Sequence, residues 1–96
     1  MSVRRTFDDD EALRVATTLG LDFATEPFLL EEFRRGMDVE LEHGRRDPAT
    51  NVTGDDPVTT GKIALAHLRE FPDYYTRLDR MEKEAEAELA DKLDPA

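Results

Sequence analysis

The sequence contains no cysteine and no tryptophan, and its one serine is Ser2. Without cysteine the chain has no disulfides, thiolate metal sites or cysteine nucleophiles, and the lone serine excludes a serine triad. No apolar run approaches the ~20 residues that a membrane-spanning helix needs. These absences exclude several enzyme classes and predict a protein that works away from the membrane.

Basic residues are also scarce, because 13 Lys and Arg stand against 23 Asp and Glu and give a formal charge of −10. Nucleic-acid binding needs a basic face, so we expect no nucleic-acid partner. Ten of the basic residues are Arg and only three are Lys. An acidic, lysine-poor surface suits a protein in high salt, whereas a GC-rich genome would also favour Arg; both interpretations stay open.

The chain length of 96 residues and the mass of 10.9 kDa predict one small domain over residues 1–96, with an ordered core over about 7–93. The pair Arg4-Arg5 is followed by acidic residues instead of an apolar segment. This pattern does not fit a secretory or twin-arginine signal, and we therefore expect a cytoplasmic protein.

Apolar spacing and helix-terminus signals divide the chain into four helices. The first begins at the acids of residues 8–11 and stops at Gly20. The second is predicted to begin with Thr25 as N-cap and Pro27 in the first turn, and to end with Gly44 just beyond it. Residues 45–56 read as a long loop, since Asp, Asn, Pro and Gly dominate them.

The third helix is predicted to open with Asp56 and Pro57 and to end before Pro72. The fourth is predicted over about 72–93. Its apolar residues form one narrow stripe, as in a coiled coil; they are Tyr74, Leu78, Met81, Ala85 and Leu89. We therefore predict an all-α bundle of about four helices and a homodimer through the last helix, because shorter helices have little surface to cover its distal half.

Each histidine has a carboxylate three residues away on the same predicted helix: Glu40 with His43, and His67 with Glu70. Such pairs share a helix face. Glu40 lies only ~20° from the centre of the apolar stripe of its helix, and His67 lies in the apolar half of its own. A buried carboxylate needs a partner, a proton or a metal. We therefore expect Glu40 and His67 to be neighbours, although both lie toward C-terminal helix ends, so that contact requires a steep crossing angle or a second chain.

Three interpretations of these residues stay open. A metal site of Glu40, His43 and His67, with Glu70 as a further candidate, would suit iron, manganese or zinc, and di-iron bundles use Glu-x-x-His. Acid–base catalysis is the second. The third is structural, with His43 near the C-terminal dipole of its helix and His67 bonded to Glu40 or to a tyrosine. The neighbouring Tyr74 and Tyr75 have hydroxyls that can bond to this cluster or simply lie at the core edge.

These segments also resemble a known family. The resemblance is carried by Glu32-Phe33, Gly36–Gly44 (GMDVELEHG), Thr50–Thr53 (TNVT), Lys62–Leu68 (KIALAHL) and Pro72–Tyr75 (PDYY) with Leu78. They are similar to a family of small uncharacterised proteins from bacteria, archaea and phages, a domain of unknown function, over residues 7–85. The resemblance implies no activity and no catalytic residue. The apolar stripe of the last helix makes protein association the leading functional hypothesis, ahead of metal binding and of an enzyme.

Overall fold

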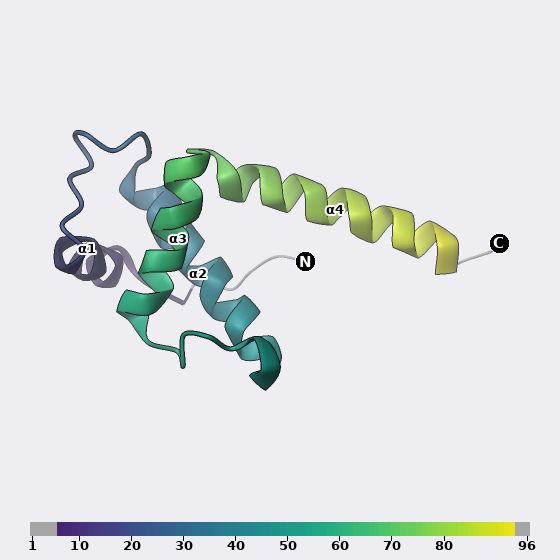
Figure 1. Ribbon diagram of the computed structural model, residues 1–96. Coiled ribbons are helices and arrows are strands. Elements are labelled where there is room, and N and C mark those ends of the chain that lie inside the picture. Colours follow the sequence, from purple (N-terminus) through teal and green to yellow (C-terminus); the bar gives the residue numbers. More distant parts are fainter. Residues whose placement is uncertain (1–5, 94–96) are drawn as a thin grey trace.

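The computed structural model describes residues 6–93 and contains four α-helices (Figure 1). They are α1 (Asp9–Thr18), α2 (Leu30–Arg46), α3 (Pro57–Glu70) and α4 (Tyr74–Leu93), with a short 3₁₀ turn η1 (Pro48–Thr50) between α2 and α3. No strand occurs in residues 6–93, so the predicted all-α fold is confirmed. None of the helices in this part of the chain has the length and apolar character of a membrane span.

The first helix begins and ends as the sequence predicts. The Asp8 side chain accepts a hydrogen bond from the Glu11 N–H at 2.7 Å, and the Glu11 carboxylate accepts from the Asp8 N–H in return, which is a capping box. At the other end Gly20 has φ +74°, and the Leu21 N–H bonds back to the Ala16 carbonyl at 2.9 Å. Glycine adopts this left-handed conformation without steric cost, and it stops the helix.

The core lies where α1, α2 and α3 pack against one another. Its largest fully buried side chains are Phe33, Met37, Leu68 and Thr60. Phe33 also contacts the rings of Phe23 and Phe28 from the preceding loop. The α1 and α3 helices approach closely at Gly61, where an added Cβ would lie 2.5 Å from Val15 Cγ1. Glycine at this position therefore sets how closely these two helices pack.

The predicted start of the second helix is wrong. It begins at Leu30, with Leu29 as an N-cap that makes no side-chain hydrogen bond. Thr25 instead belongs to a turn, in which its hydroxyl donates to the Asp22 carbonyl at 3.0 Å. Residues 20–29 stay non-helical, and this course buries Phe28 to 3% exposure beside Phe33. Burial of an aromatic ring by the loop thus outweighs the local capping signal.

The predicted end of that helix is also wrong, because α2 continues through Gly44 to Arg46. Gly44 is buried, and a Cβ there would lie 3.3 Å from Asn51 Oδ1. Glycine is therefore used for close approach of the following loop, not for ending the helix. The long connection before α3 is confirmed, with η1 inside it. Asp56 caps α3, as predicted, by accepting from the Thr59 N–H at 2.8 Å.

The fourth helix begins at Tyr74, two residues after the predicted Pro72, and ends at Leu93. Its apolar residues that join the core are Tyr74, Tyr75 and Leu78. Beyond them the helix extends away from the other three (Figure 1), and the chain measures 52 × 28 × 21 Å along its principal axes. We call residues 6–73 the body and residues 79–93 the arm.

Candidate functional site

Three side chains from three helices meet at the base of α4. Glu40 of α2 accepts a hydrogen bond at Oε2 from the Tyr75 hydroxyl of α4, with an O–O distance of 2.8 Å. The Nε2 atom of His67, on α3, lies 3.7 Å from the same oxygen. This distance is too long for a hydrogen bond. It is short enough for an ion pair between the carboxylate and a protonated imidazole. The prediction that Glu40 and His67 are neighbours is therefore confirmed within one chain.

The helix lengths explain how this contact forms without a second chain. Because α2 extends to Arg46, Glu40 lies well inside the helix instead of at its end. Figure 1 shows α2 and α3 crossing each other, and α4 starting where α3 ends. The chain turn at Pro72 therefore places Tyr74 and Tyr75 directly beside the crossing helices, where they can reach Glu40 and His67.

The aromatic rings complete the cluster. The His67 and Tyr74 rings stack at a centroid distance of 4.2 Å and an interplanar angle of 8°. The Tyr75 ring meets Tyr74 edge-on, at 5.0 Å and 81°. Tyr75 is only 2% exposed. We call Glu40, His67, Tyr74 and Tyr75 the α4 anchor.

Gly36 makes room for this anchor on α2. A Cβ atom at position 36 would lie 2.5 Å from Tyr75 Cε2, closer than real side chains pack. The hydroxyl of the same ring donates its hydrogen bond to Glu40, which lies one helical turn further along α2. The Gly36 and Glu40 positions therefore form one socket for Tyr75, and they belong to the same sequence motif.

Burial and charge decide the protonation of the two tyrosines. Burial, followed by the charge of Glu40 and the hydrogen bond to it, raises the pKa of Tyr75 far above its ordinary value. Burial and then the charges of Glu40 and Glu70 raise the pKa of Tyr74. Both hydroxyls are protonated at neutral pH. Tyr75 thus serves Glu40 as a hydrogen-bond donor, and it does not serve as a base.

The four predicted metal ligands are brought together only in part. Glu40 and His67 are neighbours, while His43 is half-buried further along α2 and Glu70 is exposed near the end of α3. In the part of the chain that the structure describes, no group of three or more His, Cys, Asp or Glu side chains is placed to hold a metal ion. The Glu40–His67 pair by itself supplies one carboxylate and one imidazole, and Tyr75 already occupies one carboxylate oxygen.

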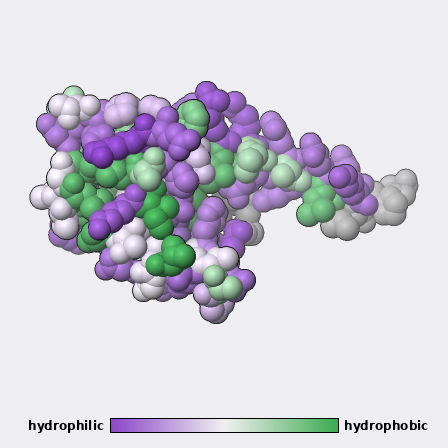
Figure 2. All heavy atoms as spheres, viewed as in Figure 1, coloured by the Kyte–Doolittle hydropathy of each residue, from purple (hydrophilic) through white to green (hydrophobic). Residues whose placement is uncertain are grey.

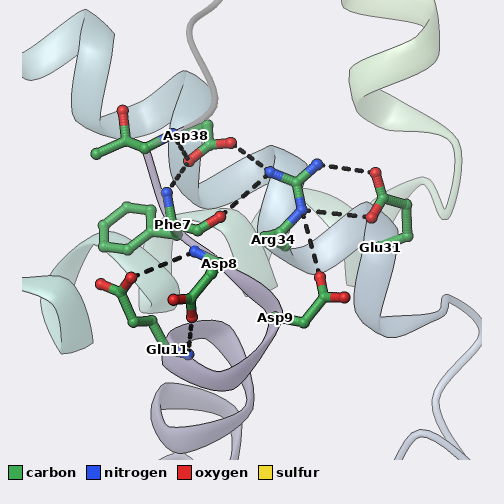
Figure 3. A network of polar contacts seen from close by, with 8 residues as sticks. Phe7, Asp8, Asp9, Glu11, Glu31, Arg34 and Asp38 are labelled. Carbon is green, nitrogen blue, oxygen red and sulfur yellow. Dashed lines mark hydrogen bonds and ion pairs between the residues drawn. The ribbon is translucent and has the colours of Figure 1, made fainter.

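A second polar cluster was missed at the sequence level. Asp38 is 4% exposed, and its Oδ1 accepts hydrogen bonds from the N–H groups of Thr6 and Phe7 at 3.1 and 2.8 Å. Its Oδ2 pairs with Arg34 Nη1 at 2.6 Å, and Arg34 also donates to the Phe7 carbonyl at 3.4 Å. Figure 3 shows these groups converging between α2 and the segment that leads into α1. This cluster fixes the start of the described chain to α2.

Arg34 is the centre of that network. It pairs with Glu31 at 2.8 Å and with Asp9 at 3.7 Å, in addition to Asp38. The hydrogen bond with Glu31 raises the pKa of Arg34, against the lowering effect of burial, and the charge of Asp38 raises it further. The spacing of four residues between Arg34 and Asp38 is the one sequence signal for this pair. The Arg34–Asp38 pair is covered by residues 6–9, which contact it directly. The spacing of apolar residues does not predict the position of that segment.

The exposed surface of the arm differs from both clusters. Figure 2 shows it as mostly hydrophilic, with apolar atoms recurring along its length. Met81 and Leu89 are 56% and 57% exposed, and Ala85 between them is exposed as well. The predicted apolar stripe of the last helix is therefore present, and its distal half faces outward from the body.

The chain belongs to DUF5661, a family of proteins of unknown function, whose sequence model matches residues 12–84. This match confirms membership of an uncharacterised domain family, and it spans the anchor, the buried ion pair and the first part of the arm. Neither the curated proteins nor the solved structures contain a significant match to the chain.

Proposed function

We propose that this member of the DUF5661 family acts in protein association, and that its arm joins two copies of the chain into a homodimer. One observation carries this proposal. The distal half of α4 extends beyond the body and leaves Met81 and Leu89 more than half exposed on one helix face. Full burial of such a side chain stabilises an assembly by roughly 1.5–3 kcal/mol.

The arm also needs a partner for its own stability. Isolated helices shorter than ~12–15 residues are marginal in water, and the arm has 15 residues beyond Leu78, the last apolar residue that joins the core. Five Glu and Asp residues lie within residues 82–91, and their mutual repulsion opposes the helix. Packing along the apolar stripe would offset this repulsion.

A second copy fits this stripe because the stripe is self-complementary. Ala85 lies at its centre, with Met81 and Leu89 four residues to either side. A small central residue lets two helix backbones approach, and the larger side chains then pack on either side of it. Symmetric dimers use the same patch on both subunits and are the commonest oligomers.

The test compares two charged substitutions at exposed leucines. Leu89→Glu should shift the mass in light scattering from twice the 10.9 kDa chain mass toward a single chain. Leu13→Glu is the matched control, since Leu13 is 47% exposed on α1 of the body and should leave the dimer unchanged. A wild-type chain that stays monomeric at high concentration would refute the proposal.

A second candidate function is metal binding at the α4 anchor. The observation that favours it is the 3.7 Å approach of His67 Nε2 to Glu40 Oε2 between neighbouring helices. Iron, manganese or zinc accept this ligand pair, and water would have to complete the coordination, because His43 and Glu70 do not join the pair in a group of three or more ligands within the described residues. Elemental analysis of protein purified without a histidine tag tests it: near-stoichiometric metal that disappears in both Glu40→Gln and His67→Ala supports the site, and metal-free protein rejects it.

A further inference from the structure

We infer that the two arms pair antiparallel, with Met81 of one chain opposite Leu89 of the partner and the two bodies at opposite ends of the dimer. This inference rests on the proposed homodimer and names the arrangement of its interface. Both orientations would bury the same stripe, so the choice between them depends on charge and shape.

Charge is distributed unevenly along α4. Residues 74–83 contain three basic and two acidic side chains, whereas residues 84–93 contain one basic and four acidic side chains. The first group is Arg77, Arg80, Lys83, Asp79 and Glu82; the second is Lys92, Glu84, Glu86, Glu88 and Asp91. A parallel pair sets the two acidic halves against each other, whereas an antiparallel pair sets each acidic half against the weakly basic half of the partner. Antiparallel pairing therefore removes most of the repulsion along the interface.

The base of the arm adds positive charge to the surface that the partner's tip would reach. Arg35 of α2 lies beside α4 and donates to Thr76 Oγ1 at 3.3 Å. Arg77 lies just before the arm and pairs with Asp73 at 2.8 Å, with 65% of its side chain still accessible. When the antiparallel pair is centred on Ala85, the partner's Asp91 lies level with Asp79, between Arg77 and Arg80. The basic residues at this end of the overlap favour the antiparallel direction.

The bodies give a second, independent argument. The body, residues 6–73, contains 16 acidic and seven basic residues, so each body is strongly negative. A parallel dimer places both bodies side by side at one end. An antiparallel overlap of residues 77–93 separates them by about 25 Å along the helices, which exceeds the Debye length of ~8 Å at physiological salt. Repulsion between the bodies is then screened.

The register follows from the stripe. Pairing Ala85 with the partner's Ala85 places Met81 opposite the partner's Leu89 in both halves of the interface. Met81 and Leu89 each lie ~40° from Ala85 around the helix, on opposite sides of it. The overlap then runs from Arg77 to the end of α4, which uses the full length of the arm without bringing it into the partner's core.

Disulfide cross-linking tests the orientation cleanly, because the chain has no cysteine of its own. Three single variants are required: Met81→Cys, Leu89→Cys and Ala85→Cys. In the antiparallel dimer two copies of residue 89 are about 12 Å apart along the helices, beyond the roughly 7 Å that a disulfide spans between Cα atoms. An equimolar mixture of Met81→Cys and Leu89→Cys, one carrying a mass tag, should give the mixed cross-linked dimer on oxidation, and neither variant alone should cross-link.

Ala85→Cys separates failure of the orientation from failure of the dimer, because it brings two thiols together in either direction. Cross-linking of Ala85→Cys together with cross-linking of Leu89→Cys alone would overturn the antiparallel arrangement and leave the dimer standing. Cross-linking of Ala85→Cys without any mixed 81–89 product would reject the register. Failure of Ala85→Cys to cross-link, with the monomer mass in solution, would reject the dimer itself.

Discussion

The body and the arm have the same kind of amphipathic helix pattern but very different surroundings. In the body, Phe33, Met37 and Leu68 are completely buried between helices. In the arm, Met81 and Leu89 recur at similar helical spacing and are more than half exposed. An apolar stripe therefore indicates which face of a helix packs against another apolar surface, but it does not show whether that surface belongs to the same chain.

The polar contacts separate the two regions in the same way. The body has a buried ion pair between Arg34 and Asp38, whose side chains are 7% and 5% exposed. The arm has the exposed pair of Lys83 with Asp79, on neighbouring turns of one helix. Exposed pairs of this kind are worth at most about 1 kcal/mol, whereas breaking a buried pair costs several. The difference predicts that stability resides in the body.

The largest expected effect is a core truncation in the body. Phe33→Ala should lower the free energy of unfolding by about 3–5 kcal/mol, because it removes a fully buried ring from the centre of the core. Leu89→Ala is the matched change in the arm and should cost less than about 0.5 kcal/mol in dilute solution. Urea unfolding monitored by circular dichroism measures both. Equal losses would contradict the separation of body and arm.

The next largest effect concerns the ion pair of the body. Asp38→Ala should cost about 3–5 kcal/mol, because it removes the buried partner of Arg34, which then keeps only the exposed carboxylates of Glu31 and Asp9 as charged partners, and because it frees the N–H groups of Thr6 and Phe7. Arg45→Ala is the control, since its pair with Asp55 is exposed and should cost less than about 1 kcal/mol. Thermal melts of the two variants measure both losses of stability. An Asp38→Ala variant that loses no more stability than Arg45→Ala would show that the network does not stabilise the fold.

The α4 anchor, where the two regions join, should show a smaller effect with a characteristic pH dependence. Tyr75→Phe should cost about 1–2 kcal/mol at neutral pH, because Glu40 loses its hydrogen bond. The pKa of Tyr75 is raised in the folded chain above its ordinary value of 10.0. The unfolded chain therefore loses this proton first, and stability conferred by Tyr75 is complete below pH 10 and declines as pH rises above it.

Unfolding curves between pH 9 and 11 measure that decline. It should be shallower in Tyr75→Phe than in the wild-type protein. Tyr74→Phe is the comparison: the pKa of Tyr74 is also raised by burial, so this variant should reduce the decline as well, but by less, because Tyr74 is less buried than Tyr75. Identical pH profiles for the wild type and Tyr75→Phe would contradict the role given to this hydroxyl.

The smallest expected effect is that of salt. A chain with a formal charge of −10 repels itself at low ionic strength, and salt screens this repulsion. The thermal midpoint should therefore rise by several degrees from low salt to molar potassium chloride. A midpoint that stays constant or falls would remove both this expectation and the halophilic interpretation of the composition.

Local signals predicted the parts of the fold that depend on neighbouring residues. The caps at Asp8 and Asp56 and the stop at Gly20 are of this kind. The approach of Glu40 to His67 is a contact between two helices, and it was predicted because each residue lies on the apolar side of its own helix. The failures come from long-range packing. Phe28 is buried against Phe33 and delays the start of α2, and Gly44 gives room to Asn51 instead of ending the helix.

The candidate site shows the same division. Glu40 and His67 were predicted from helical spacing, but the hydrogen bond from Tyr75 depends on the gap at Gly36, which lies 39 residues earlier in the sequence. The Arg34–Asp38 network was missed because residues 6–9 cover it, and no periodic pattern places that segment. Sequence patterns within one helix were sufficient for the helix faces and for the caps at Asp8 and Asp56, and insufficient for the two ends of α2 and for contacts made by the loops and residues 6–9.

Amide hydrogen exchange as a function of protein concentration tests the central claim most directly, because it reads the body and the arm in one experiment. We predict that amides of residues 81–92 exchange quickly in dilute protein and become protected as concentration rises, while those of Phe33, Met37 and Leu68 keep constant protection. Protection of the arm that does not change with concentration would contradict the claim that a second copy of the chain covers it.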